Sequence, residues 1–137
     1  VYHHQLRPAL KFVSGFPEQR FVIDHCAKPD IRNHKIDDWK MYMKEMASFP
    51  NLYCKLSGLL TEAKWKEWKE ADLYPYLDTV FELFGTDRLL FGSDWPVLQL
   101  SGSYGQWKDL LVRYMEKYSE ADRQKIFGLN AIKFYNL

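Results

Sequence analysis

The chain has 137 residues, of which 47% are hydrophobic and 17% aromatic, and its 19 basic and 18 acidic side chains give a formal net charge of +1. This length suffices for one modest domain with its own core, and the composition argues against disorder. The balanced charge excludes the basic field that nucleic acid or an anionic membrane would need. No apolar run approaches the roughly 18 residues of a membrane span.

Two cysteines, Cys26 and Cys54, form neither a CxxC pair nor a zinc-type Cys–His spacing. We therefore expect two free, buried thiols in a reducing compartment, which predicts a cytoplasmic protein.

In chain order, apolar residues at helical spacing first predict a helix over residues 6–13, which ends before Gly15. The run RFVIDH (20–25) then predicts a buried strand, and a second apolar stripe predicts a helix over 36–47. NLYCKLSG (51–58) follows as a second strand.

A third helix is expected over 73–84, closed by Gly85, and RLLFGSD (88–94) predicts the third strand. The clearest amphipathic helix covers 107–118. A Ser119–Asp122 capping box should then start a short helix that ends near Gly128.

The three strands are continuous apolar runs, which is typical of parallel strands covered on both faces. Their ends near His25, Ser57 and Asp94 are spaced by 32 and 37 residues, a suitable length for one βα unit. The sequence therefore predicts an α/β fold with three parallel strands and intervening helices.

Functional side chains gather at the C-terminal ends of parallel strands, and the first strand ends at Asp24 and His25. His25 could bind a metal, act as an acid or base, hydrogen-bond a carbonyl, or cap loop backbone structurally. Because side chains alternate along a strand, Asp24 should point the other way and bond to backbone. Lys28 is a candidate for binding an anion, although a solvated loop lysine is the simpler interpretation.

The second strand places Tyr53, Lys55 and Ser57 on one face. A lysine in a buried strand is costly unless it is paired or lies at a solvated mouth. We expect Lys55 to bind a substrate carboxylate or an oxyanion, unless the strand is an edge strand with Lys55 in water.

The third strand ends at Asp94, because Pro96 biases Trp95 away from helical conformation and stops the strand. A carboxylate there can activate a water, ligate a metal, or cap a helix. Trp95 either floors a sugar-sized pocket or belongs to the core.

Three motifs in this order, VIDHCAKP, NLYCKLSG and DRLLFGSDWP, are followed by IFGLNAIKFY near the end of the chain. Together they resemble the amidohydrolase-related family that includes L-fuconolactone, L-rhamnonolactone and 2-pyrone-4,6-dicarboxylate lactonases. The resemblance implies that residues 1–137 form the C-terminal part, about strands 6–8 with their helices, of a single (β/α)₈ TIM-barrel domain.

By this resemblance, Asp94 activates the hydrolytic water, and His25 polarises the substrate carbonyl or binds a metal. Family members differ in needing a divalent ion, so one zinc or manganese, or none, is expected, with His25 and Asp94 as candidate ligands. Lys55, Ser57, Tyr53, Trp95 and Lys28 become the candidate substrate-binding residues.

The family's His-x-His motif of barrel strand 1 has no counterpart here. We therefore expect a fragment that is inactive alone and that associates, as a homo-oligomer or otherwise, through exposed sheet edges.

The leading hypothesis is hydrolysis of a sugar-acid lactone or similar cyclic ester, with a small molecule rather than nucleic acid or a membrane as partner. A metal-dependent decarboxylase or another amidohydrolase-superfamily hydrolase is the first alternative, because one fold hosts many chemistries. The second alternative is a non-enzymatic α/β interaction domain.

Overall fold

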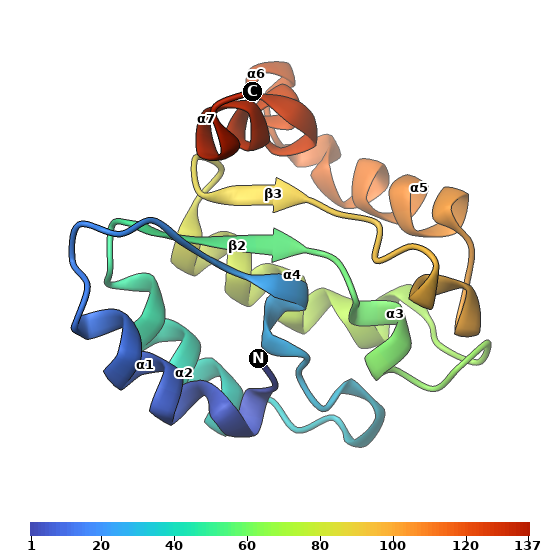
Figure 1. Ribbon diagram of the computed structural model, residues 1–137. Helices are drawn as coiled ribbons and strands as arrows, with labels where there is room; N and C mark the ends of the chain where they lie inside the picture. The colour runs from blue at the N-terminus through green and yellow to red at the C-terminus, as the bar shows by residue number, and fades with distance from the viewer.

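The computed structural model describes all 137 residues and contains one sheet of three strands. They are β1 (Phe21–Ile23), β2 (Leu52–Leu56) and β3 (Leu89–Phe91), paired in parallel in the order β1-β2-β3. All of the strands therefore end at one side of the molecule (Figure 1). The predicted parallel α/β arrangement is confirmed, although each strand is shorter than predicted.

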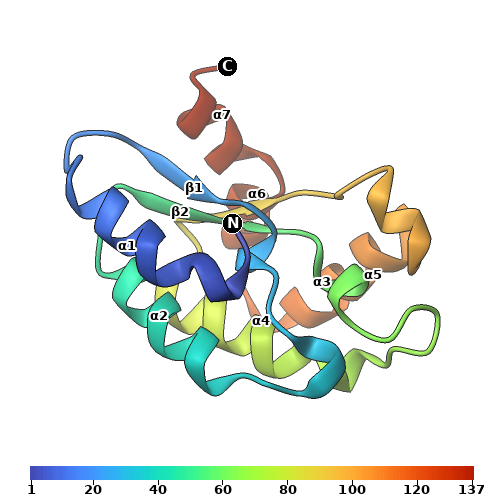
Figure 2. The same ribbon diagram turned by 60° about the horizontal axis from the view of Figure 1, so that its bottom comes forward.

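Seven α-helices connect and flank the strands. They are α1 (Leu6–Ser14), α2 (Asp37–Ala47), α3 (Leu59–Glu62), α4 (Glu70–Phe84), α5 (Tyr104–Tyr114), α6 (Glu120–Gln124) and α7 (Asn130–Tyr135). Helices α1, α2 and α4 lie on one side of the sheet, and α7 lies on the other (Figures 1 and 2). The four longest helices match the predicted apolar stripes.

The core forms where α4 packs beneath the central strand. Leu73, Leu77 and Val80 of α4 are fully buried, as are Cys54 and Leu56 of β2. Burying a leucine or valine side chain contributes about 1.5–3 kcal/mol, so this stripe holds α4 to the sheet. Both cysteines are free and buried, as predicted.

The predicted helix end near Gly128 is wrong. After α6 the chain continues through a π-helical turn, Lys125–Leu129, directly into α7. The Lys125 ammonium lies 2.9 Å from Asp87 and 3.3 Å from Asp122, which holds this turn against the loop before β3. Gly128 stays in ordinary helical backbone because nothing at this position requires a left-handed residue.

The buried side chain of Asn130, at the start of α7, links this helix to β3 by hydrogen bonds. Its buried Nδ2 donates to the carbonyls of Thr86 (2.7 Å) and Leu89 (2.8 Å). Asn130→Ala should lower the free energy of unfolding by about 2–3 kcal/mol, because it leaves buried carbonyls unpaired. Urea unfolding measures this. Asn33→Ala, at an exposed asparagine that bonds to Asp30, is the control, and an equal loss in both variants would contradict the assignment.

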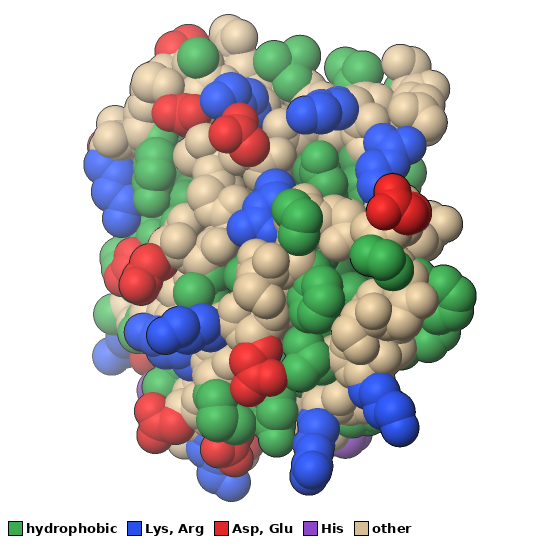
Figure 3. All heavy atoms as spheres, turned by 90° about the vertical axis from the view of Figure 1, so that its left-hand side faces the viewer, with side chains coloured by type: hydrophobic (Ala, Val, Ile, Leu, Met, Phe, Trp, Pro, Cys, Tyr) green, Lys and Arg blue, Asp and Glu red, His purple; other side chains and the backbone are tan.

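The end of the molecule where the strands begin is a mixed surface. Hydrophobic side chains there are interspersed with Lys, Arg, Asp and Glu (Figure 3).

No helix of the protein has the length and apolar character needed to cross a bilayer. The residues predicted to act chemically lie at the opposite end, where the strands finish.

Candidate active site

Three polar side chains meet at the C-terminal rim of the sheet, each one following a different strand. His25 follows β1, Ser57 follows β2 and Asp94 follows β3. The Nδ1 atom of His25 lies 2.8 Å from Ser57 Oγ, and its Nε2 atom lies 3.5 Å from Asp94 Oδ1. The structure thus places His25 and Asp94 side by side on one rim, whereas their catalytic roles remain predictions.

His25 is presented by a left-handed turn rather than by a strand. His25, Cys26, Ala27 and Lys28 all have positive φ, between 48° and 58°. Left-handed backbone costs a non-glycine residue roughly 1–2 kcal/mol. The chain leaves the strand at Ile23, so the prediction that RFVIDH is extended throughout is wrong at its end.

Contacts from distant elements hold this turn. The indole Nε1 of Trp39, in α2, donates to the carbonyl of Cys26 at 2.8 Å, and His3 Nδ1 lies 2.7 Å from the carbonyl of Lys28. The Cys26 thiol donates to the Lys55 carbonyl at 3.4 Å. Strained backbone persists where its surroundings over-determine it, which is typical of functional sites.

Gly58 lets the imidazole lie against the turn after β2. Its φ is +71°, and a Cβ at this position would lie 2.6 Å from His25 Cβ and 2.9 Å from His25 Cγ. Real Cβ atoms do not approach so closely, so only glycine leaves room for the ring. The ring is thereby fixed between Gly58, Ser57 and Asp94.

Asp94 is held in a second left-handed position, with φ 58°. Its side chain is 9% exposed, and its buried Oδ2 has no hydrogen-bond partner among the protein groups. The indole of Trp107, in α5, donates to the carbonyl of Gly92 at 2.9 Å and so anchors the segment that leads to Asp94. Oδ2 of the carboxylate is therefore unpartnered, while Oδ1 faces the imidazole.

Trp95, next to Asp94, is 64% exposed. The alternative that Trp95 belongs to the core is therefore wrong, and its predicted role in shaping a sugar pocket remains untested. Val97 and Leu100, in the helical turn that follows, are also exposed, so the segment after Asp94 presents several apolar side chains at the surface.

Lys55 and Asp24 form an ion pair at 2.6 Å, and the Lys55 ammonium also lies 5.9 Å from the centre of the Tyr135 ring. The expectation that Asp24 bonds to backbone is therefore wrong. Burial acts to lower the pKa of Lys55, but hydrogen bonds with Asp24 and Tyr135 outweigh it and raise the pKa above its ordinary value. Any anionic substrate group that Lys55 binds must share it with Asp24.

Asp24→Asn should reverse this balance and lower the pKa of Lys55. Without the carboxylate, Tyr135 alone offsets the desolvation of the ammonium, so the proton is released at a lower pH than in the parent chain. NMR titration of the Lys55 side chain measures the change. Glu62→Gln removes the partner of Lys28 and should leave Lys55 unaffected. An unchanged Lys55 pKa in Asp24→Asn would contradict the pairing.

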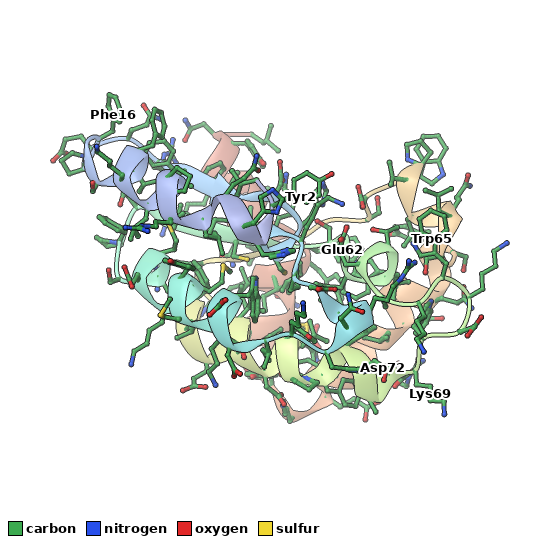
Figure 4. The ribbon with its side chains drawn as sticks, turned by 90° about the horizontal axis from the view of Figure 1, so that it is seen from below. Tyr2, Phe16, Glu62, Trp65, Lys69 and Asp72 are labelled. Atoms are coloured by element: carbon green, nitrogen blue, oxygen red, sulfur yellow. The ribbon has the colours of Figure 1, made fainter.

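Two further candidates already have partners within the protein. Lys28 pairs with Glu62 at 2.7 Å and lies 5.6 Å from the centre of the Tyr2 ring; Tyr2 and Glu62 lie near each other in Figure 4. Tyr53 is 8% exposed and packs edge-on against Phe134 of α7 at 4.9 Å. These contacts argue against the predicted anion site at Lys28 and the predicted substrate contact of Tyr53.

Ser57, predicted to touch substrate, is fully buried and bonds to His25 instead. The sequence also did not identify Trp39 and Trp107 as supports of the site. Their apolar spacing predicted that both are core residues. The one feature that could have indicated a supporting role is the indole N–H, which usually finds a hydrogen-bond acceptor when it is buried.

The predicted metal ligands do not complete a metal site within this chain. His25 Nε2 and the free oxygen of Asp94 are suitable donors, but catalytic zinc takes three protein ligands. Asp24 is engaged by Lys55, and no group of three His, Cys, Asp or Glu side chains converges. A metal at this rim would therefore need at least one further ligand from outside these residues.

Comparison with known proteins identifies the family. The family model described as "Amidohydrolase" matches residues 1–137, so the chain belongs to the amidohydrolase family. It is 41% identical over 144 residues to an L-fucono-1,5-lactonase of Burkholderia ambifaria, covering all of this chain and 48% of that enzyme. It is 29% identical over 152 residues to an L-rhamnono-gamma-lactonase of Scheffersomyces stipitis, covering 97% of this chain and 45% of that enzyme.

A crystal structure of an amidohydrolase from Burkholderia multivorans with bound zinc has the same fold. It superposes with a TM-score of 0.94 at 35% identity, over all of this chain and 51% of that one. The chain thus spans about half the length of the relatives that it matches. The predicted resemblance to lactonases of this family is confirmed.

Proposed function

We propose that this chain supplies strands 6–8 of an amidohydrolase barrel that hydrolyses a sugar-acid lactone. The observation that carries the proposal is the pairing of His25 Nε2 with Asp94 Oδ1 at 3.5 Å on the C-terminal rim. In barrels of this type, chemistry occurs at that rim. The similarity to L-fucono-1,5-lactonase supports a six-membered sugar lactone as the substrate class.

In the proposed reaction the ionised Asp94 removes a proton from a water molecule, whose oxygen attacks the lactone carbonyl carbon. The carbonyl oxygen gains negative charge, which a hydrogen bond from His25 stabilises. The tetrahedral intermediate then collapses as the ring C–O bond breaks. The departing ring oxygen takes the proton from Asp94, which gives the hydroxy acid and restores the carboxylate.

The outer strands β1 and β3 have partners on one side within this chain, β2 in each case. Unpaired strand edges are sites of association. We therefore propose that these edges accept the remaining strands of the barrel, or another copy of the chain, and that the assembled protein acts in the cytoplasm. Any zinc or manganese would be shared with ligands from that remaining part.

A fusion tests the function. The part of the Burkholderia ambifaria lactonase that lies outside the matched region is joined to residues 1–137, and hydrolysis of L-fucono-1,5-lactone is followed by acid release. We expect turnover above the spontaneous rate from the fusion and none from residues 1–137 alone. The intact lactonase is the positive control, and the donor part alone is the negative control. A folded fusion that is inert toward lactones would contradict the proposal.

A further inference from the structure

We propose that Ser57 is a positioning residue that holds His25 in the tautomer with its proton on Nε2. The catalytic consequence rests on the proposed function, but the tautomer can be measured without any turnover. The inference starts from the 2.8 Å contact between Ser57 Oγ and His25 Nδ1.

This contact admits two hydrogen-bond directions. Either Nδ1–H donates to the serine oxygen, or the serine hydroxyl donates to an unprotonated Nδ1. Ser57 is fully buried, its backbone N–H donates to the Lys55 carbonyl, and its hydroxyl bonds to His25 alone. In the first arrangement the hydroxyl proton would be buried without an acceptor, which proteins avoid. The second arrangement gives both the hydroxyl proton and the Nδ1 lone pair a partner, so Nδ1 accepts and Nε2 carries the proton.

The remaining neighbours agree with this assignment. Nε2 faces the Asp94 carboxylate at 3.5 Å, and a carboxylate favours an N–H over a lone pair opposite it. The absence of a side chain at Gly58 is what lets the ring lie beside Ser57, because a Cβ at Gly58 would be 3.2 Å from Nδ1. The serine hydroxyl and the imidazole are therefore in contact because position 58 has no side chain.

The tautomer distinguishes the two roles that the family resemblance implies for His25, polarising a carbonyl and binding a metal. With its proton on Nε2, the ring has one donor, which faces Asp94 at 3.5 Å in this structure and would turn to the carbonyl of a bound substrate. A metal bound at Nε2 would need that lone pair, so the proton would have to move to Nδ1 and leave the Ser57 hydroxyl proton without an acceptor. Ser57 thus favours polarisation of the carbonyl by His25 over metal ligation.

Long-range ¹H–¹⁵N correlation spectra of the ¹⁵N-labelled chain, recorded at alkaline pH where imidazoles are neutral, report the tautomer of each histidine. His25→Gln assigns the His25 signals. We expect Nε2 of His25 to show the signal of a protonated ring nitrogen and Nδ1 that of an unprotonated one. The opposite pattern in the parent chain would overturn the proposal.

Variants then separate Ser57 from Asp94. Ser57→Ala should shift the Nδ1 resonance of His25 toward the value of a ring nitrogen without a hydrogen bond. The tautomer with its proton on Nδ1 should then become populated as well. Ser57→Thr should restore the parent pattern. Asp94→Asn should keep the proton on Nε2. An unchanged Nδ1 resonance in Ser57→Ala, or a change of tautomer in Asp94→Asn, would overturn the assignment.

Ser101→Ala is the matched control, because Ser101 is also a buried serine but its hydroxyl has no partner. It should leave the His25 signals unchanged. If Ser57→Ala does not fold, the parent spectrum and Asp94→Asn still decide the question. An inert lactonase fusion in which His25 keeps its Nε2 proton would refute the proposed function and leave this inference standing.

Discussion

Asp94→Asn in the lactonase fusion is expected to lower kcat for lactone hydrolysis by about 10²–10⁴-fold, the usual contribution of a general base. The amide has the shape of the carboxylate but cannot take a proton from water. Asparagine also tolerates left-handed backbone, so the φ of 58° at this position should survive the substitution. The loss should therefore appear in kcat, with little change in the unfolding midpoint.

Asp109→Asn provides the matched control for this prediction. Asp109 is an exposed aspartate in α5, and its substitution should leave kcat within about twofold, since it removes surface charge alone. Initial rates of acid release at saturating lactone measure both variants. Undiminished turnover by Asp94→Asn would show that another group activates the water.

Gly58→Ala is expected to reduce the free energy of unfolding by roughly 2–5 kcal/mol. The left-handed φ of +71° contributes roughly 1–2 kcal/mol of strain, and overpacking of a methyl against His25 adds roughly 1–3 kcal/mol. The methyl must displace the imidazole from Ser57, so the His25 ring signals should shift as well. Urea unfolding and NMR of the imidazole measure the two effects.

Gly128→Ala is the corresponding control within the same chain. Gly128 lies in the helical turn before α7, outside the left-handed region, and a Cβ there meets nothing within 4 Å. This variant should gain about 0.5–1 kcal/mol, because alanine restricts the unfolded chain. Equal losses from both glycines would mean that the contact with His25 does not determine the cost at Gly58.

The sequence predicted the architecture well, because residues buried on one face of a helix recur at helical spacing in the sequence. The stripe Leu73–Phe84 is buried along α4, and the strand runs are mostly apolar, with Lys55 as the exception in β2. The strand ends were predicted less well. His25–Lys28 adopt left-handed backbone without a single glycine, and the Trp39 contact that supports this turn comes from a helix elsewhere in the chain.

The site was predicted in outline by one rule, that parallel strands end at the same rim. This rule brought His25, Ser57 and Asp94 together. The rule does not predict which groups these side chains bond to, because a shift of a few ångströms decides whether Ser57 contacts a substrate or the imidazole. The same limit applied to Asp24 and Lys55, whose pairing depends on how the lysine stem passes Gly92.

The strand order sets the distance between the imidazole of His25 and the carboxylate of Asp94. His25 extends from one outer strand and Asp94 from the other, so two inter-strand spacings of roughly 4.8 Å separate their backbones. The two side chains reach inward from opposite sides and meet above Ser57 on the middle strand. Substitutions that change the twist or spacing of β2 should therefore alter the distance between the imidazole and the carboxylate without changing either residue.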